Sequence, residues 1–497
     1  MRRVLFILFF LQALVWLNAQ QREVPLTFDD ALQTALSNNE KVKQAVLQQR
    51  QAEAEMDAVR TLRLPQVSLS ANYVMLSDDI TIDMHGVKDA ITPLYSALAQ
   101  YGTFSGVVNP DPATSGVMPV LPDDVSTRIV REQLADGLVQ VENGEWDKLI
   151  QKKQFGFVSA GFTWPLFTGG KINAANRAAK IRLSEAVQVE RQKAGELMSE
   201  VVERYFGLAL AVEAGQVRLE VLEAMESHLS DAEKMYAEGM IAKAELLHAR
   251  VYHAEAEREY KMAMRQLEVI NKSLGNSLAD SAGVRYLPVT ALFYNEYVEP
   301  ADYFRLQSIE NNALLKQVSA KQSLAGQAAK AERSGMLPAV AAFGTYNIAN
   351  IDLTPSMSDY AAGITLSWKI FGGASARHKY RSAILAGEQI DQVWSKAVRD
   401  VEMGIEKYHQ ELQMLVEQLN ELESAASFAD EYYRVRMEAF NEGMASSSDV
   451  TDASLAVAKV RVERLRAIYN YDVTLARLLE LAGIPEYFNS YMAGGKL

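Results

Sequence analysis

Cysteine is absent from the 497 residues of this chain. Its absence excludes a disulfide framework and the thiolate ligands of zinc and iron–sulfur sites. It also excludes a lipid anchor attached to an N-terminal cysteine. We therefore expect a protein that folds without covalent cross-links and carries no lipid at its N-terminus.

The chain also has no excess of basic residues, with 50 Lys and Arg against 63 Asp and Glu, and few long apolar runs. The net charge is −13 at pH 7, and an acidic chain repels nucleic-acid phosphates, so we expect no nucleic-acid partner. Residues 1–19 have the pattern of a secretory signal peptide, because Arg2 and Arg3 precede an apolar run and Ala19 ends it. Beyond residue 19 no apolar stretch reaches the ~18 residues of a transmembrane helix. An exported chain of this kind is expected to be periplasmic, secreted or an outer-membrane barrel.

Motifs for catalysis are lacking as well. The six histidines are scattered, and His248 and His253 stand five apart rather than at the i, i+4 spacing of a helical metal pair. No glycine-rich phosphate loop or nucleophile elbow occurs. We expect no enzyme, no catalytic residue, no cofactor and no metal site.

What the chain does contain is an internal duplication. Four short motifs occur twice in the same order: Asn38-Asn39 and Asn311-Asn312, Leu64-Pro65 and Leu337-Pro338, Trp164-Pro165-Leu166-Phe167 and Trp368-Lys369-Ile370-Phe371, and Glu238-Gly239-Met240 and Glu442-Gly443-Met444. The first two pairs are 273 positions apart and the last two are 204 apart. The first copy therefore carries an insertion of 69 residues between Leu76 and Phe155.

Each copy is expected to contain a helix, a strand, a loop, a strand, a very long helix, a glycine turn and a helix. Residues 171–238 and 374–442 contain no proline, and each would span on the order of 100 Å at ~1.5 Å per residue. Gly239 and Gly443 stand where a helix needs a left-handed residue to stop. Leucines at spacings of three and four predict coiled-coil packing, as at Leu412, Leu415, Leu419 and Leu422.

Three strands are evident from alternation, at 66–75, 158–166 and 360–370. One side of each strand is apolar and the other is small and polar, which suits a barrel wall between lipid and a water-filled lumen. A soluble sheet with one buried face is the alternative. Four strands per chain cannot close a membrane barrel, so several chains would share one: two chains give eight strands and three give twelve.

The duplicated plan occurs together with the opening Leu26-Thr27-Phe28-Asp29-Asp30-Ala31-Leu32, the Leu-Pro strand entries, the Trp-Pro-Leu-Phe-Thr-Gly-Gly strand exit and the Glu-Gly-Met turns. In these features the chain resembles the TolC-type outer-membrane efflux family over residues 26–483. The resemblance implies a mixed α and β membrane protein: a homotrimer with a 12-stranded β-barrel in outer-membrane lipid, continued by an α-helical coiled-coil tunnel in the periplasm. It also implies an exit duct that docks to a periplasmic adaptor (membrane fusion) protein and an inner-membrane transporter of the RND, ABC or MFS type. Drug efflux and type I protein secretion both stay open.

The resemblance also assigns residues. Adaptor docking falls on the helix-turn tips, Gly239, Met240, Ile241, Gly443, Met444 and Ala445, although the glycines could serve only as helix caps. A periplasmic aperture falls on Asp449, Asp452 and Glu245, which could instead be ordinary helix-start carboxylates. The family's basic residue after the second glycine is replaced by Ala445, which leaves the closed-state latch open. Trp164 and Trp368 are expected at the membrane interface.

The expected domain organisation follows the repeats. A signal peptide covers 1–19, the first repeat covers 20–290 and includes the inserted loop 77–154, the second repeat covers 291–485, and a tail covers 486–497. The insertion is acidic and is expected to be an extracellular loop. Two other classes remain: a periplasmic structural coiled coil without a membrane part, and a secreted pore-forming or adhesive protein.

Overall fold

The computed structural model describes residues 23–280, 283–355 and 357–496. The expected signal peptide, 1–19, lies outside the described residues. The chain divides into a helical unit (Met1–Thr61, Gly170–Met336 and Ile370–Leu497) and a strand unit (Leu62–Gly169 and Leu337–Lys369). Within the described ranges, no helix combines the length and the hydropathy that a membrane span requires.

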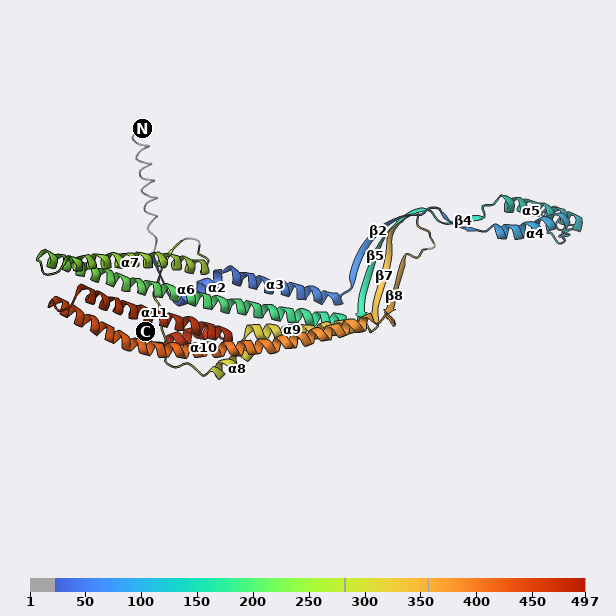
Figure 1. Cartoon of the computed structure of the whole chain (residues 1–497). Coiled ribbons are helices and arrows are strands. Elements are labelled where there is room, and N and C mark those ends of the chain that lie inside the picture. The colour runs from blue at the N-terminus through green and yellow to red at the C-terminus, as the bar shows by residue number, and fades with distance from the viewer. Residues whose placement is uncertain (1–22, 281–282, 356, 497) are drawn as a thin grey trace, which may run out of the picture. The chain divides into compact units, whose positions relative to one another are not determined.

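The helical unit repeats one arrangement twice, as the duplication predicts. Its helices are α2 (Phe28–Asn38), α3 (Glu40–Arg60), α6 (Lys171–Ala237) and α7 (Lys243–Ser277), then α8 (Ala301–Asn311), α9 (Ala313–Ser334), α10 (Ser375–Asn441) and α11 (Ser447–Ala482). Two long hairpins, α6 with α7 and α10 with α11, run side by side in pairs (Figure 1). The long helices α6 and α10 each contain 67 residues, and the predicted lengths are confirmed.

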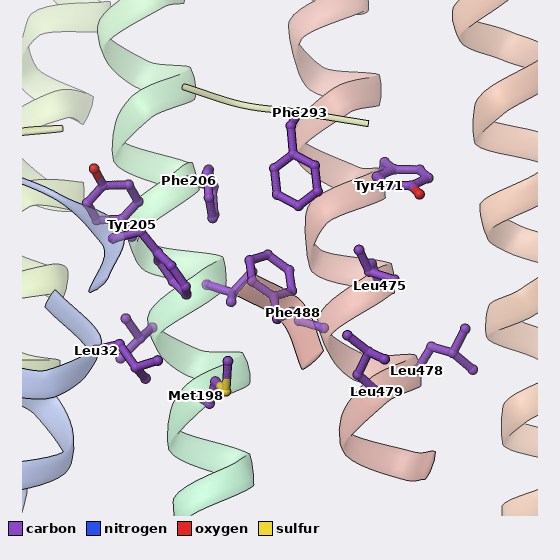
Figure 2. Close-up of a cluster of buried hydrophobic side chains, with 14 of the residues drawn as sticks. Leu32, Met198, Tyr205, Phe206, Phe293, Tyr471, Leu475, Leu478, Leu479 and Phe488 are labelled. Carbon is purple, nitrogen blue, oxygen red and sulfur yellow. The ribbon is translucent and has the colours of Figure 1, made fainter. Parts of the chain in front are cut away.

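A shared core joins the two repeats within the helical unit. Phe206 of α6, Phe293 and Phe488 form a cluster of rings (Figure 2). Phe28 of the first repeat packs against Phe206 and Phe488, and the ring centroids of the cluster lie 5.3 to 6.0 Å apart. Phe488 begins α12 (Phe488–Gly494), which follows the short turn η2 (Pro485–Tyr487). The residues predicted as a tail therefore supply a fully buried core side chain.

Next to this core, a short parallel sheet ties the start of the first repeat to its end. The strands are β1 (Glu23–Leu26) and β6 (Arg285–Pro288). The buried hydroxyl of Tyr205 donates to the Leu26 carbonyl at 2.7 Å and accepts from the Thr290 amide at 3.0 Å. A buried phenol needs such partners, and here they hold both segments against α6.

The strand unit contains one four-stranded antiparallel sheet, in the order β2-β5-β7-β8. Its strands are β2 (Gln66–Met75), β5 (Gln154–Phe167), β7 (Ala339–Ile351) and β8 (Tyr360–Ser367), and a short turn, η1 (Thr61–Arg63), precedes β2. The register puts the predicted apolar residues on one face, as in the pairs Val67–Phe162 and Leu69–Ala160. The other face carries small polar residues, and Ser70 and Ser159 share a hydrogen bond of 3.0 Å there. The predicted alternation is confirmed along most of the sheet.

One boundary of the predicted strands is wrong, and one irregularity of the strand pairing was not predicted. The strand expected over 360–370 ends at Ser367, because its partner strand begins at Ala339 and the preceding Pro338 has no N–H for the ladder. A bulge also follows Pro165, so Phe167 rather than Leu166 pairs with Val340.

The insertion, expected as a loop, is folded. It contains β3 (Ile80–Asp83), α4 (His85–Tyr101), α5 (Asp123–Asn143) and β4 (Asp147–Gln151). Helices α4 and α5 pack against each other, and Gly137 brings α5 close to the ring of Tyr95. The segment was expected to be a loop because it connects two strands. Pro93 nevertheless lies inside α4, where packing against α5 outweighs the lost helix hydrogen bond.

Candidate tips and aperture of the helical unit

The two predicted helix-turn tips have the same hydrogen-bonded geometry. Gly239 has φ +76° and Gly443 has φ +74°, so both adopt the left-handed conformation that glycine favours. The Gly239 amide donates to the Tyr236 carbonyl at 3.0 Å, and the Met240 amide donates to the Met235 carbonyl at 2.8 Å. The second tip repeats this pattern, with bonds from Gly443 to Phe440 and from Met444 to Ala439. Both helices therefore end in a Schellman motif, which satisfies their last carbonyls.

The residues after the glycines differ in what they contribute to the fold. Met240 and Met444 are 65% and 77% exposed, so neither side chain supports the core of its own chain. Ile241 instead packs against the small apolar cluster of Ala232, Leu246 and Ala249. Ala445 is half-buried. Each tip thus presents one exposed, flexible methionine, a side chain that adapts to varied apolar surfaces.

Asp449 has a structural task at the start of α11. Its carboxylate accepts from the backbone amide of Ser446 at 2.9 Å and from the Ser446 hydroxyl at 2.8 Å. The Ser446 hydroxyl accepts from the Asp449 amide in return, which completes a capping box. The hydrogen bonds from Ser446, together with the charge of Arg436, hold the pKa of Asp449 below its ordinary value. The carboxylate therefore stays charged at the very start of the helix.

The three predicted aperture residues come from both repeats. Asp449 and Asp452 lie in the first turns of α11, and Glu245 lies in the first turn of α7. Asp452 is exposed, whereas Glu245 is half-buried. The charge of Glu245 acts on the buried ring of His228 in α6, and that ring in turn contacts the Ser447 hydroxyl next to Asp449. The structure thus brings the tip segments of the two repeats together around His228.

His228 is a residue that the sequence analysis missed. It is 4% exposed, and its ring packs on the ring of Phe440 with centroids 4.9 Å apart. Burial lowers its pKa, while the charges of Asp231 and Glu245 act in the opposite direction. A single histidine inside a 67-residue helix belongs to no sequence motif, so only its contact with Ser447 of the second repeat reveals its role.

The two predicted interface tryptophans belong to the strand unit. Trp164 lies on the apolar face of β5 opposite Ala342, and its indole N–H donates to the Arg63 carbonyl at 3.0 Å. Trp368 follows directly after β8. Both side chains are about half exposed, so each offers an apolar ring near the end of its strand.

Comparison with solved structures gives the fold its class. The chain resembles a membrane protein from Pseudomonas aeruginosa with a TM-score of 0.69 and 13% identity, covering 92% of this chain and 90% of that one. It resembles the outer membrane protein VceC of Vibrio cholerae with a TM-score of 0.67 and 14% identity, covering 92% and 96%. The CmeC outer membrane channel of Campylobacter jejuni gives a TM-score of 0.67 at 14% identity, covering 92% and 86%. The fold is that of a TolC-like outer-membrane channel: mostly helical, duplicated, with four antiparallel strands per chain.

The family follows from the sequence itself. The family model described as "Outer membrane efflux protein" matches residues 154–279 and 306–484, which is more than half of the chain. The chain belongs to the outer membrane efflux protein family, and it is a non-enzymatic outer-membrane efflux channel of tripartite export systems. The predicted resemblance is confirmed. A comparison with curated protein sequences gives no significant match.

Proposed function

We propose that three copies of this chain share one 12-stranded barrel and form the exit duct of their export system. The two open edges of the four-stranded sheet carry the proposal, since among the described residues β2 pairs only with β5 and β8 pairs only with β7. Unpaired strand edges are costly in lipid, where each unsatisfied backbone group costs several kcal/mol. Pairing β2 of one copy with β8 of the next removes every edge once the ring closes.

The two faces of the sheet support the same arrangement. Val67, Leu69, Ile364 and Leu366 share the apolar face and are largely exposed in the single chain, as lipid contact would require. We assign the opposite face, with Ser159, Thr365 and Ser367, to the lumen. Trp164 and Trp368 then lie at the lipid–water boundary, where indole rings are favoured.

In this proposal the helical unit lies in the periplasm and receives cargo there. The exposed tips, Gly239 to Ile241 and Gly443 to Ala445, dock a periplasmic adaptor, which joins the duct to an inner-membrane transporter of the RND, ABC or MFS type. Asp449, Asp452 and Glu245 surround the aperture at the same end. Residues 1–19 direct export, no lipid is attached at an N-terminal cysteine, and the insertion 77–154 faces the exterior.

Cross-linking of the strand edges tests the shared barrel, and the absence of native cysteine makes the experiment clean. Leu69→Cys lies on β2 and Ile364→Cys lies on β8, on the same face. A short bismaleimide added to outer membranes should give the doubly substituted chain a ladder of bands that ends at three chains. Each single variant, and Ala160→Cys combined with Ile364→Cys, should give no ladder, because β5 lies inside the sheet. A ladder ending at two chains, or no ladder at all, would overturn the trimer.

A further inference from the structure

The root of the folded insertion brings together three side chains that are far apart in sequence. Asp83 ends β3, Asp147 begins β4, and the two are direct partners across the antiparallel pair. His85 follows at the start of α4, and its Nδ1 lies 2.8 Å from Asp83 Oδ1 and 3.6 Å from Asp147 Oδ1. One ligand atom from each of the three side chains lies within 4.8 Å of the other two.

The backbone holds these side chains in position. The amide of His85 donates to Asp83 Oδ1 at 2.8 Å, and the amide of Met84 donates to the Trp146 carbonyl at 2.9 Å. The Trp146 indole donates to the Val141 carbonyl at 2.7 Å, so the last turn of α5 is fixed as well. The carboxylates therefore face each other because the β3–β4 ladder requires it.

Asp83 is already a hydrogen-bond partner of His85, but the two opposed carboxylates still concentrate negative charge that attracts a cation. Like charges directly opposite each other on paired strands destabilise the pair. Asp83, Asp147 and the imidazole nitrogen offer two hard oxygen ligands and one borderline nitrogen ligand, all exposed to solvent. Ligand atoms around a tetrahedral zinc ion lie about 3.4 Å apart, given metal–ligand distances of about 2.0–2.2 Å. The distances from His85 Nδ1 to Asp83 Oδ1 and Asp147 Oδ1, 2.8 and 3.6 Å, lie on either side of that value.

We propose that Asp83, His85 and Asp147 form a binding site for a divalent transition-metal ion of the zinc type, with water completing its coordination. The mixed nitrogen and oxygen set favours such an ion over calcium or magnesium, which take oxygen ligands. The ion links β3 to β4, the two strands next to α4 and α5 in the chain. Its binding stabilises the root of the insertion by mass action.

Zinc titration of the purified full-length protein in detergent tests the site. Calorimetry with zinc chloride should give one ion per chain, and His85→Gln, Asp83→Asn and Asp147→Asn should each weaken binding at least tenfold. Asp83→Asn keeps an oxygen that can accept from the His85 amide, so it removes charge without removing the turn. His378→Gln and Asp136→Asn, an exposed histidine outside the insertion and an exposed carboxylate on α5, are matched controls and should bind as wild type.

Two further measurements locate the ion and separate binding from folding. Crystals soaked in zinc should give an anomalous peak between the three side chains, and zinc should slow trypsin cleavage within the insertion of the wild type only. Circular dichroism and the oligomeric state should be the same in every variant. The proposal is overturned by uptake below one ion per chain, by equal uptake in Asp83→Asn/Asp147→Asn, or by preference for calcium over zinc. If His85 only hydrogen-bonds with the carboxylates and no ion binds, calorimetry would show uptake below one ion per chain.

Discussion

The side-chain amide of Asn312 donates a hydrogen bond to the backbone carbonyl of Leu481 at 2.7 Å, where α8 passes into α9 beside the end of α11. Asn39 makes the corresponding bond to the Ser277 carbonyl at 3.0 Å in the first repeat. The side-chain oxygens of both asparagines also cap the following helices, α9 and α3. One buried residue in each repeat therefore joins two helix ends.

The first prediction is that these two asparagines stabilise the helical unit more than their exposed neighbours do. Asn312→Ala or Asn39→Ala removes a helix cap, which lowers the free energy of unfolding by about 0.5–2 kcal/mol. Each also leaves a buried carbonyl without its hydrogen-bond donor, which costs about 1–3 kcal/mol more. Chemical denaturation followed by tryptophan fluorescence should show each loss. Asn38→Ala is the control, because Asn38 is exposed, and it should change stability little. Equal effects at Asn38 and Asn39 would contradict this role.

The Asn-Asn motif illustrates what sequence alone could and could not provide. Its repetition predicted the duplication, and proline-free length predicted α6 and α10 to within one residue at each end. The motif's hydrogen bonds were not predictable, because Asn312 and Leu481 are 169 positions apart. Contacts of that range depend on packing, and no local pattern encodes them.

The candidate sites divide in the same way. The tips were found because a glycine turn is a local signal that occurs twice. His228 was missed, since the contact with Ser447 crosses from one repeat to the other. Asp83 and His85 are neighbours in sequence, but Asp147 joins them only through the β3–β4 register. The insertion itself was expected to be a loop because it connects two strands of the predicted barrel, and the helices α4 and α5 within it were not predicted.

The second prediction concerns pH and the buried ring of His228. Its folded-state pKa lies below the ordinary value of 6.5, because burial disfavours the charged form. Its contribution to stability is therefore fully present above pH 6.5 and is lost as pH falls toward the lower folded-state pKa. Hydrogen exchange, corrected for intrinsic rates, should show the start of α11 around Ser447 opening more readily at pH 5.5 than at pH 7.5.

Two variants separate this residue from general acid effects. His228→Gln keeps a polar side chain but does not titrate, so the pH dependence at the tip should shrink. His248→Gln changes an exposed histidine on α7 and should leave the wild-type pH dependence intact. If His228→Gln opens with the same pH profile as wild type, another group controls the tip.

The third prediction concerns the faces of the sheet. Thr365 pairs with Ala341 on the polar face, and Leu366 pairs with Val340 on the apolar face. A membrane-impermeant maleimide that enters the pore should label Thr365→Cys but not Leu366→Cys. Ser159→Cys should behave as Thr365→Cys does, because the register puts both on the same face. Labelling at 366 with none at 365 would reverse the assignment of lumen and lipid.

The fourth prediction separates helix capping from partner docking at the tips. A Cβ added at Gly443 would have no described atom within 4 Å, so the positive φ is the strain that Gly443→Ile introduces at this position. Asparagine tolerates that conformation better. Gly443→Asn should therefore keep the turn, and Gly443→Ile should abolish export in a protein that still assembles. Co-purification with the adaptor supplies the direct measurement.

Met444 tests docking without touching the turn. Because its side chain is exposed, Met444→Ser should leave stability unchanged and reduce adaptor co-purification severalfold. Met262→Ser, at an exposed methionine away from the tip on α7, should leave co-purification unchanged. Normal export and normal co-purification in both Gly443→Ile and Met444→Ser would remove the case for docking at this tip.

The last prediction concerns the aperture charge. In a trimer, Asp449 and Asp452 would bring six carboxylates around one opening, and a ring of like charge in a low-dielectric wall concentrates cations. Single channels in planar bilayers should be cation-selective and blocked by multivalent cations from the periplasmic side. Asp449→Asn/Asp452→Asn should weaken both properties. Asparagine at 449 keeps an oxygen that can accept from the Ser446 amide, so the capping box survives the loss of charge. Alanine at 449 would remove that acceptor.

Glu226→Gln is the control: it removes an exposed carboxylate of α6 that is farther from the tip, and it should change neither selectivity nor block. Wild-type selectivity and block in the double variant would mean that both residues serve only the start of α11 and that the constriction lies elsewhere.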